Sequence, residues 1–279
     1  MPTGVRPFRV TTAATDWRKR VVDAVLARLT DRTPFVLGLC GPQGSGKSTA
    51  ARIIRRMLVE QGHACAALSI DDLCLTRAER QDLARRVHPL LATRGPPGTH
   101  DNDLGLKTFA ALARAGDTRL PSFDKGADDR ASLEDWPFVR TPVDCLIFEG
   151  WCVGAKPQPV GDLLEPVNAL ERQEDAEGIW RTYVNDQLAG PYQKLFAPID
   201  LLVQLRAPAF EQVLAWRGQQ EADLKAAGGG PAAMNKAQLT RFIQHYERLT
   251  RWIDREMPGR ADAVVDLDAD RNVNHLRIG

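Results

Sequence analysis

The sequence has no long apolar run, no recognisable export signal and almost no net charge. No stretch approaches the roughly 20 apolar residues that a membrane-spanning helix needs, and residues 1–12 lack the apolar core of a secretory signal. Lysine and arginine total 37 against 36 aspartates and glutamates, a net charge of +1. Without an excess of one sign, the chain has no general attraction to nucleic acid or to anionic membranes. We therefore expect neither a membrane nor a nucleic acid as partner.

Cysteine and histidine form no disulfide or metal-binding pattern. The cysteines number five, with no C-x-x-C, and are Cys40, Cys65, Cys74, Cys145 and Cys152. Three of them, Cys40, Cys65 and Cys145, lie in apolar, strand-like runs, where a thiol behaves as a small hydrophobe. The five histidines are scattered without the spacing of metal ligands. We expect no disulfide framework and no zinc site, and a reducing, cytoplasmic environment.

Apolar runs of strand length alternate with helical patterns along most of the chain. Strands are predicted at residues 34–40, 64–70, 144–151, 199–206 and, as the last, 263–267. Helices are predicted at 16–29, 49–60, 103–115, 208–227 and 238–257, and a short helix opens with a capping box at Thr76 and Glu79. This alternation predicts an α/β fold in which a mainly parallel sheet carries helices on both faces.

We interpret residues 1–279 as a single domain. Residues 1–32 form its N-terminal helical segment. Residues 208–235 contain the break Gly228-Gly229-Gly230-Pro231, which is typical of a hinge or loop, so this segment is predicted to be a small helical lid.

The most informative segment is a glycine-rich loop between the first predicted core strand and the next helix. It reads Gly41-Pro42-Gln43-Gly44-Ser45-Gly46-Lys47-Ser48-Thr49 and fits G-x-x-x-x-G-K-[ST], the P-loop, without a mismatch. Its glycines let successive N–H groups turn toward one anion, and the helix adds its own free N–H groups. Lys47 reaches the β- and γ-phosphates, and the Ser48 hydroxyl can ligate Mg²⁺. The strand–loop–helix context favours nucleoside triphosphate binding over a glycine-rich turn without a ligand.

Acidic residues at two other strand ends indicate chemistry beyond binding. In open parallel sheets the ligand lies beyond the carboxyl ends of the strands. One apolar strand ends in Glu149, the pattern of an acid that holds Mg²⁺, although such an acid can also merely cap a turn. Another ends in Asp71 and Asp72, where a carboxylate can orient an acceptor hydroxyl and take its proton. We expect Asp71 in that role and Asp72 as a cap of the turn toward Leu75.

Four motifs follow one another along the chain and together resemble a known family. They are Ser69-Ile70-Asp71-Asp72, Arg94-Gly95-Pro96-Pro97-Gly98-Thr99-His100-Asp101, Leu120-Pro121-Ser122-Phe123-Asp124-Lys125 and Phe148-Glu149-Gly150-Trp151. The sequence looks like the D-glycerate 3-kinases of plant type and their fungal and bacterial relatives, which are P-loop kinases similar to phosphoribulokinase, uridine–cytidine kinase and pantothenate kinase. The resemblance extends from about Phe35 to about Asp268.

The resemblance implies an ATP- and Mg²⁺-dependent kinase whose acceptor is D-glycerate. Lys47, Asp71 and Glu149 match the catalytic set, with Asp71 as the base and Glu149 as the acid that holds magnesium. Arg217 matches a lid region whose arginines contact phosphates, although it can also be an ordinary charge on a helix surface. Lys125 and Arg130 fall in the segment that faces the acceptor in related kinases.

Further candidates for the acceptor site follow from its charge. Glycerate is an anion, so a cation must meet its carboxylate, best through a bidentate arginine. Arg94 and Arg130 are the candidates, and the alternative is a solvated loop arginine. The resemblance also implies that His100 lies in the substrate-side loop, where it can contact the substrate or bond the loop backbone.

Two departures from the family pattern lie beside the inferred acceptor site. Leu73-Cys74 follow the double aspartate where relatives usually carry aromatic residues, and only Gly126-Ala127-Asp128-Asp129 separate Lys125 from Arg130. They leave uridine, pantothenate or a sugar phosphate as alternative acceptors of the same reaction.

Two other classes of function are weaker hypotheses. One is a GTP- or ATP-driven switch or assembly factor. The guanine-reading motif N-K-x-D should then appear, but the only Asn-Lys, in Asn235-Lys236-Ala237-Gln238, lacks the aspartate. An RNA kinase should carry a basic stripe interleaved with aromatic residues, and none is present. We therefore predict a small-molecule kinase, and the residues indicate no oligomeric state.

Overall fold

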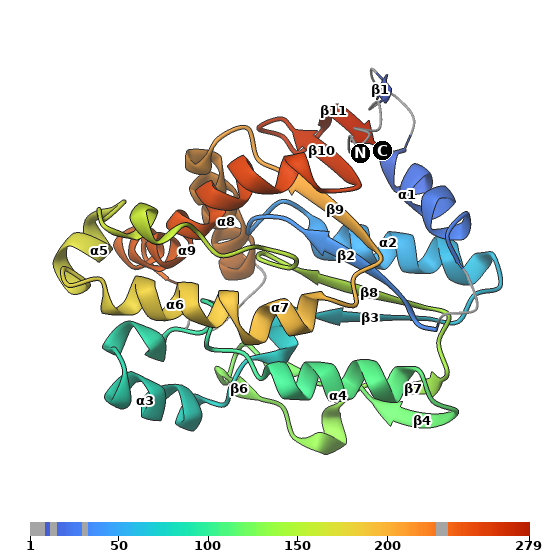
Figure 1. Cartoon of the computed structure of the whole chain (residues 1–279), viewed down its shortest axis with the longest axis horizontal. Coiled ribbons are helices and arrows are strands. Elements are labelled where there is room, and N and C mark those ends of the chain that lie inside the picture. Colours follow the sequence, from blue (N-terminus) through green and yellow to red (C-terminus); the bar gives the residue numbers. More distant parts are fainter. Residues whose placement is uncertain (1–8, 12–15, 30–32, 227–233) are drawn as a thin grey trace, which may run out of the picture.

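The computed structural model describes residues 9–11, 16–29, 33–226 and 234–279, and a seven-stranded sheet runs through this part in the order β1-β11-β10-β9-β2-β8-β3 (Figure 1). The strands are β1 (Arg9–Thr11), β2 (Phe35–Cys40), β3 (Cys65–Ser69), β8 (Cys145–Gly150), β9 (Leu201–Arg206), β10 (Ala263–Leu267) and β11 (Val273–Ile278). The five strands β10, β9, β2, β8 and β3 are parallel to one another, while β11 pairs antiparallel with β10 and β1 pairs antiparallel with β11. The mainly parallel sheet is confirmed, but residues 263–267 are not the last strand, because β11 follows.

Helices cover both faces of the sheet, as predicted (Figure 1). On one face lie α1 (Trp17–Leu26), α2 (Lys47–Glu60) and α8 (Phe210–Ala226), and on the other α4 (Asn102–Leu112), α7 (Pro191–Phe196) and most of α9 (Lys236–Glu256). Alternate residues of β2 enter the two cores. Phe35, Leu37 and Leu39 pack in the first, and Val36 and Cys40 in the second. The continuous apolar run of β2 thus reflects a strand buried on both sides.

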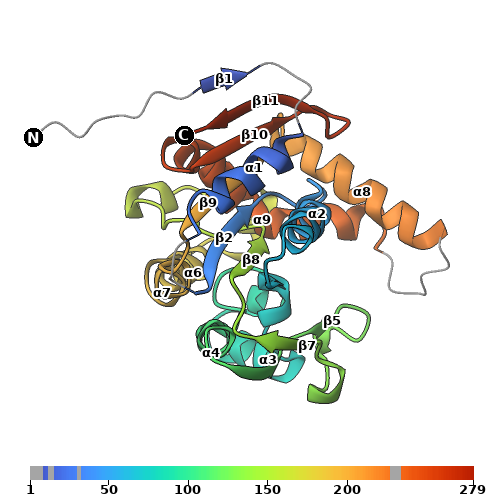
Figure 2. The same ribbon diagram turned by 90° about the vertical axis from the view of Figure 1, so that its right-hand side faces the viewer.

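Between β3 and β8 the chain forms a lower layer of helices and short strands (Figure 2). It contains α3 (Arg77–Arg86), α4, the pair β4 (Gly116–Arg119) and β7 (Phe138–Thr141), and the pair β5 (Phe123–Asp124) and β6 (Asp129–Arg130). The capping box of α3 is confirmed: Thr76 Oγ1 accepts the Glu79 N–H at 3.2 Å, and Glu79 Oε2 accepts the Thr76 N–H at 2.8 Å.

The region from 169 to 196 folds into helices that we did not predict. They are α5 (Ala169–Glu174), α6 (Ile179–Ala189) and α7. The helices predicted at 208–227 and 238–257 are present as α8 and α9, whereas the break Gly228-Gly229-Gly230-Pro231 lies outside the described residues. No helix among the described residues has the length and apolar character needed to cross a membrane.

Close packing joins β8 to the turn that follows β3. All residues of β8 are buried, and the Phe148 ring lies edge-on to Phe109 at 5.2 Å between centroids. The turn η1 (Ile70–Leu73) begins against the end of β8, because a Cβ on Gly150 would lie only 2.3 Å from Ile70 Cγ2. A residue without a side chain at 150 therefore lets the two acidic strand ends approach each other.

We predict that Gly150→Ala destabilises the protein by about 1–3 kcal/mol, because the added methyl group overpacks the contact with Ile70. Gly161→Ala is the matched control, since nothing lies within 4 Å of a Cβ at that position. Urea unfolding should show a lower midpoint for Gly150→Ala only. Equal midpoints for the two variants would contradict this account of the contact.

Candidate active site

The predicted P-loop leads from the end of β2 into α2 and is braced from outside. Gly46 is the N-cap of α2 and provides no side-chain cap, so the first N–H groups of the helix lack a side-chain acceptor. A Cβ on Gly44 would lie 2.5 Å from Trp216 Cβ, so α8 packs directly on the loop. Arg271 Nε donates to the Gly44 carbonyl at 2.6 Å, and its guanidinium lies over the Trp216 ring. The loop is held in shape before any anion binds.

Ser48 and Glu149, the predicted magnesium ligands, are brought into contact. Ser48 Oγ donates to Glu149 Oε1 at 2.8 Å. Glu149 is only 6% exposed, and its Oε2 has no hydrogen-bond partner among the described residues. A buried carboxylate oxygen without a partner is costly, and a hard cation would satisfy it. The pair therefore fits Mg²⁺ chemically.

The protein can supply only part of a magnesium shell at this place. Within the described ranges, no three His, Cys, Asp or Glu side chains gather so that they could hold a metal ion by themselves. Mg²⁺ in phosphate sites usually keeps waters and binds through one or two protein ligands plus the phosphates. Ser48 and Glu149 suit an ion that arrives with a nucleotide.

Asp71 lies in η1, one residue beyond the turn's start, and its carboxylate meets Lys125. Asp71 Oδ2 and Lys125 Nζ are 2.9 Å apart, with the two side chains 38% and 60% exposed. Burial disfavours the charge of Asp71, but Lys125 and Lys47 outweigh it and lower the pKa of Asp71 to about 2. Asp71 also raises the pKa of Lys125. Both groups are therefore charged at neutral pH.

The pKa of the neighbouring Asp72 shifts in the opposite direction. We expected Asp72 to cap the turn toward Leu75, and this prediction is wrong. Its Oδ1 accepts the N–H of Phe123 in β5 at 3.2 Å, and Ser69 Oγ caps η1 by accepting the Asp71 N–H. Burial raises the pKa of Asp72 to about 6, against the hydrogen bond from Phe123. Asp72 therefore anchors β5 rather than the turn.

The predicted acceptor cations each have an aspartate partner. Arg94 Nη1 pairs with Asp128, and Arg130 Nη2 pairs with Asp101 at 3.3 Å and with the Cys74 carbonyl at 3.2 Å. Donors are left over on both side chains. Only Nη1 of Arg94 donates a hydrogen bond within the described structure, and Arg130 Nε is buried without a partner there. Both guanidinium groups thus keep donors that no described residue uses.

His100 and Arg217 are the last two predicted site residues. The His100 ring is 4% exposed and contacts the Tyr192 hydroxyl rather than the loop backbone. Burial lowers the pKa of His100 to about 4, although Asp71 opposes the shift, so the ring is neutral at pH 7. The Arg217 guanidinium lies 5.9 Å from the centroid of the Phe242 ring, between α8 and α9. It follows Trp216, the residue that packs on the P-loop.

Several side chains that shape the site were missed. Arg80 is 1% exposed; it donates to the carbonyls of Leu75, Ala92 and Asp128 and pairs with the Asp128 carboxylate at 3.0 Å. Nothing in the sequence separates Arg80 from the other arginines of α3. Arg271 could have been found, because it follows β10 at the carboxyl edge of the sheet, where ligands bind.

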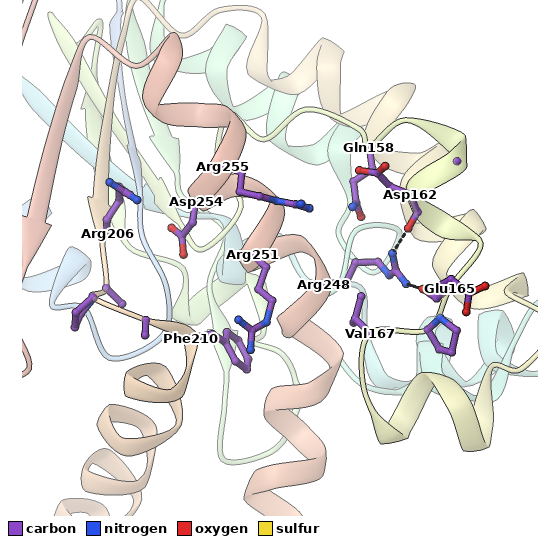
Figure 3. Close-up of a pocket in the computed structure, with 15 residues that line it drawn as sticks. Gln158, Asp162, Glu165, Val167, Arg206, Phe210, Arg248, Arg251, Asp254 and Arg255 are labelled. Carbon is purple, nitrogen blue, oxygen red and sulfur yellow. Dashed lines mark hydrogen bonds between the residues drawn. The ribbon is translucent and has the colours of Figure 1, made fainter.

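A cavity of about 650 Å³ lies between α9, the start of α8 and residues 158–167 (Figure 3). No residue of the P-loop lines it, nor do Asp71 and Glu149. Its arginines already meet protein groups: Arg248 pairs with Glu171, and Arg251 with Glu211 and Glu247. A smaller cavity of about 410 Å³ is lined by Ser48, Asp72 and Glu149 among others. Because it contains the predicted magnesium ligands, we take the smaller cavity as part of the candidate active site.

Comparison with known proteins places the chain among kinases, although no family model matches it. It is 36% identical to the uncharacterized kinase mug58 of Schizosaccharomyces pombe over 76% of this chain and 78% of that protein. It is 30% identical to the chloroplastic D-glycerate 3-kinase of Arabidopsis thaliana over 87% of this chain, and this match spans 54% of the plant protein. The solved structure of D-glycerate 3-kinase from Cryptococcus neoformans is 28% identical and superimposes with a TM-score of 0.77, over 94% of this chain and 99% of that one. The chain belongs to the family of P-loop kinases that includes D-glycerate 3-kinase, and ATP-dependent phosphoryl transfer is the chemistry of that family.

Proposed function

We propose that this protein transfers the γ-phosphoryl group of ATP to a hydroxyl of a small metabolite, with D-glycerate, giving 3-phosphoglycerate, as the acceptor. One observation carries the proposal. The P-loop, the Ser48–Glu149 pair and the ionised Asp71 follow three adjacent parallel strands and meet at one edge of the sheet.

The mechanism needs positioning more than strong base chemistry. Phosphoryl transfer has a loose transition state, so the acceptor hydroxyl loses its proton late. Asp71 orients that hydroxyl and receives the proton while the new O–P bond forms and the bond to the leaving ADP breaks. Mg²⁺ bound with the nucleotide would neutralise charge on the phosphate oxygens, and Ser48 and Glu149 would hold it. A carboxylate with a pKa of about 2 is adequate here, because it remains ionised and correctly placed.

The acceptor side is compatible with a small hydroxy acid. Arg94 and Arg130 retain donors for a carboxylate, and Lys125 lies beside Asp71. The departures from the family pattern at Leu73 and Cys74 do not oppose glycerate, because both side chains are fully buried. Their side chains pack inside the protein instead of facing an acceptor. Likeness to two D-glycerate 3-kinases supports the same substrate.

Purified protein with Mg-ATP should release ADP only when an acceptor is added. In a panel of D-glycerate, uridine, pantothenate and ribulose 5-phosphate, we expect the highest kcat/KM for D-glycerate. Faster turnover of another member would replace glycerate as the substrate. Absence of turnover with every member would refute these assignments, and acceptor-independent hydrolysis with nucleotide-dependent binding to a protein would favour a switch.

The two adjacent aspartates provide a matched test of the base. We expect Asp71→Asn to lower kcat by about 100- to 10,000-fold, the usual contribution of a positioned base, with ATP affinity nearly unchanged. Asp72→Asn should retain most of kcat, because Asp72 anchors β5 and an amide oxygen can still accept the Phe123 N–H. Steady-state kinetics and ATP titration measure both. If Asp71→Asn keeps kcat within a few-fold, Asp71 is not the base.

Lys47→Ala tests the phosphate contact separately. Loss of a charged hydrogen bond to phosphate should weaken productive ATP binding by about 10- to 100-fold. Isothermal titration with a non-hydrolysable ATP analogue measures this loss. Lys19→Ala, which removes an exposed lysine of α1, is the control and should bind like the unaltered protein. Equal affinity of Lys47→Ala and the control would contradict the assigned role.

A further inference from the structure

A hydrogen-bonded pair of buried side chains lies beside Asp71. His100 Nδ1 and the Tyr192 hydroxyl oxygen are 2.5 Å apart, although the two residues lie 92 positions apart in the sequence. The rings meet edge to face, with centroids 5.7 Å apart. The backbone of His100 forms a β-bridge with Cys74, and the Cys74 N–H donates to the Asp71 carbonyl at 3.2 Å, so His100 lies against the turn that carries Asp71. The pair therefore belongs to the surroundings of the reacting hydroxyl.

The hydrogen bonds of Tyr192 determine where its proton points. The hydroxyl oxygen accepts the Gly98 N–H at 2.9 Å, so it already has a donor. Burial raises the pKa of Tyr192 well above its usual range, which keeps the phenol protonated. Within the described structure, the one acceptor that its O–H can reach is His100 Nδ1. Because a buried hydroxyl proton needs an acceptor, Tyr192 donates and His100 Nδ1 accepts.

The other ring nitrogen of His100 then carries the hydrogen. A neutral imidazole has one N–H, so an accepting Nδ1 requires an Nε2–H. Nε2 is buried and has no hydrogen-bond partner among the described residues. An unpaired buried donor is unfavourable, and a ligand oxygen that reaches it removes the penalty. Nε2 is thus a donor without an acceptor among the described residues.

We infer that Tyr192 fixes His100 as the Nε2–H tautomer, so that His100 donates an uncharged hydrogen bond to an acceptor oxygen next to the hydroxyl that faces Asp71. This inference rests on the proposed kinase function for its ligand. The hydroxyl to be phosphorylated meets Asp71, an acceptor of hydrogen bonds, while a second oxygen meets His100, a donor. The acceptor class is therefore a small molecule with two neighbouring oxygens, either a hydroxy acid or a vicinal diol. Tyr192 acts as a positioning residue.

The tautomer can be tested without turnover, and therefore independently of the proposed substrate. Long-range ¹H–¹⁵N correlation spectra of protein labelled with ¹⁵N-histidine distinguish the two neutral tautomers and the charged ring. His100→Gln assigns the signal by its loss. We expect His100 as Nε2–H from pH 6 to 8, and a mixture of tautomers in Tyr192→Phe. An Nδ1–H or charged His100 in the unaltered protein would overturn the inference.

Kinetics tests the donor and its positioning. We expect Tyr192→Phe to raise the acceptor KM about tenfold and to leave the KM for ATP within about twofold. Tyr183→Phe is the matched control, because Tyr183 also packs on Gly98 but has no hydrogen bond to His100. His100→Gln retains an N–H donor and should keep kcat/KM about tenfold higher than His100→Leu. Equal losses in these two variants, or no change in Tyr192→Phe, would refute the donor role.

Substrate analogues identify the oxygen that His100 contacts. 3-Hydroxypropanoate lacks the 2-hydroxyl of D-glycerate, and glycerol lacks its carboxylate. We expect the ratio of kcat/KM for D-glycerate to that for one of these analogues to fall about tenfold in His100→Leu. The group that this analogue lacks is then the group that His100 contacts. If the preference over both analogues survives in His100→Leu, His100 does not contact the acceptor. If the unaltered protein turns over no member of this set, the proposed substrate fails while the tautomer result stands.

Discussion

The parallel register of β8 between β2 and β3 is the constraint on which the site depends. Glu149 pairs with Leu39 of β2 on one side and with Ser69 of β3 on the other. Because all three strands run in the same direction, the P-loop, the acid of β8 and the turn with Asp71 leave the sheet at one edge. Residues of a strand alternate between faces, so Glu149 shares the α2 face with Cys145 and Ile147 and meets Ser48. A slip of one residue would turn Glu149 to the opposite face.

Within that frame, neighbouring charges decide what each acid can do. Asp71 and Asp72 are adjacent, yet the pKa of the first is lowered by Lys125 and Lys47, whereas burial raises that of the second. In the proposed reaction, Lys125 would also limit the repulsion between Asp71 and an incoming triphosphate. Identical side chains thus become an ionised group paired with Lys125 and an anchor for β5. Their surroundings, not their chemical type, separate the two roles.

The sequence was sufficient where the information is local and insufficient where it is distant. The P-loop, the capping box at Thr76 and the strand ending in Glu149 are patterns of a few consecutive residues, and periodicity predicts the strands and helices around them. Contacts that order the acceptor side join distant positions: Arg80 bonds the carbonyl of a residue 48 positions away, and His100 bonds Tyr192. No local pattern marks such partners. The strands of β5–β6 are also too short to show alternation.

Under the proposed function, specificity for the acceptor follows from how the charges of the candidate site are already paired. Arg94 is held by Asp128, so an acceptor carboxylate must share the guanidinium with a protein carboxylate. This sharing lowers the binding free energy that an acceptor gains from its charge alone. It therefore disfavours anions that make no further hydrogen bond in the site. A neutral donor such as the His100 Nε2–H group adds selectivity of another kind, because it rewards a correctly placed oxygen whether or not that oxygen is charged. A wrong ligand would leave this buried donor without an acceptor. Such a loss discriminates between ligands more sharply than the loss of one apolar contact does. Under the proposed function, recognition therefore depends on the positions of the acceptor oxygens more than on net charge.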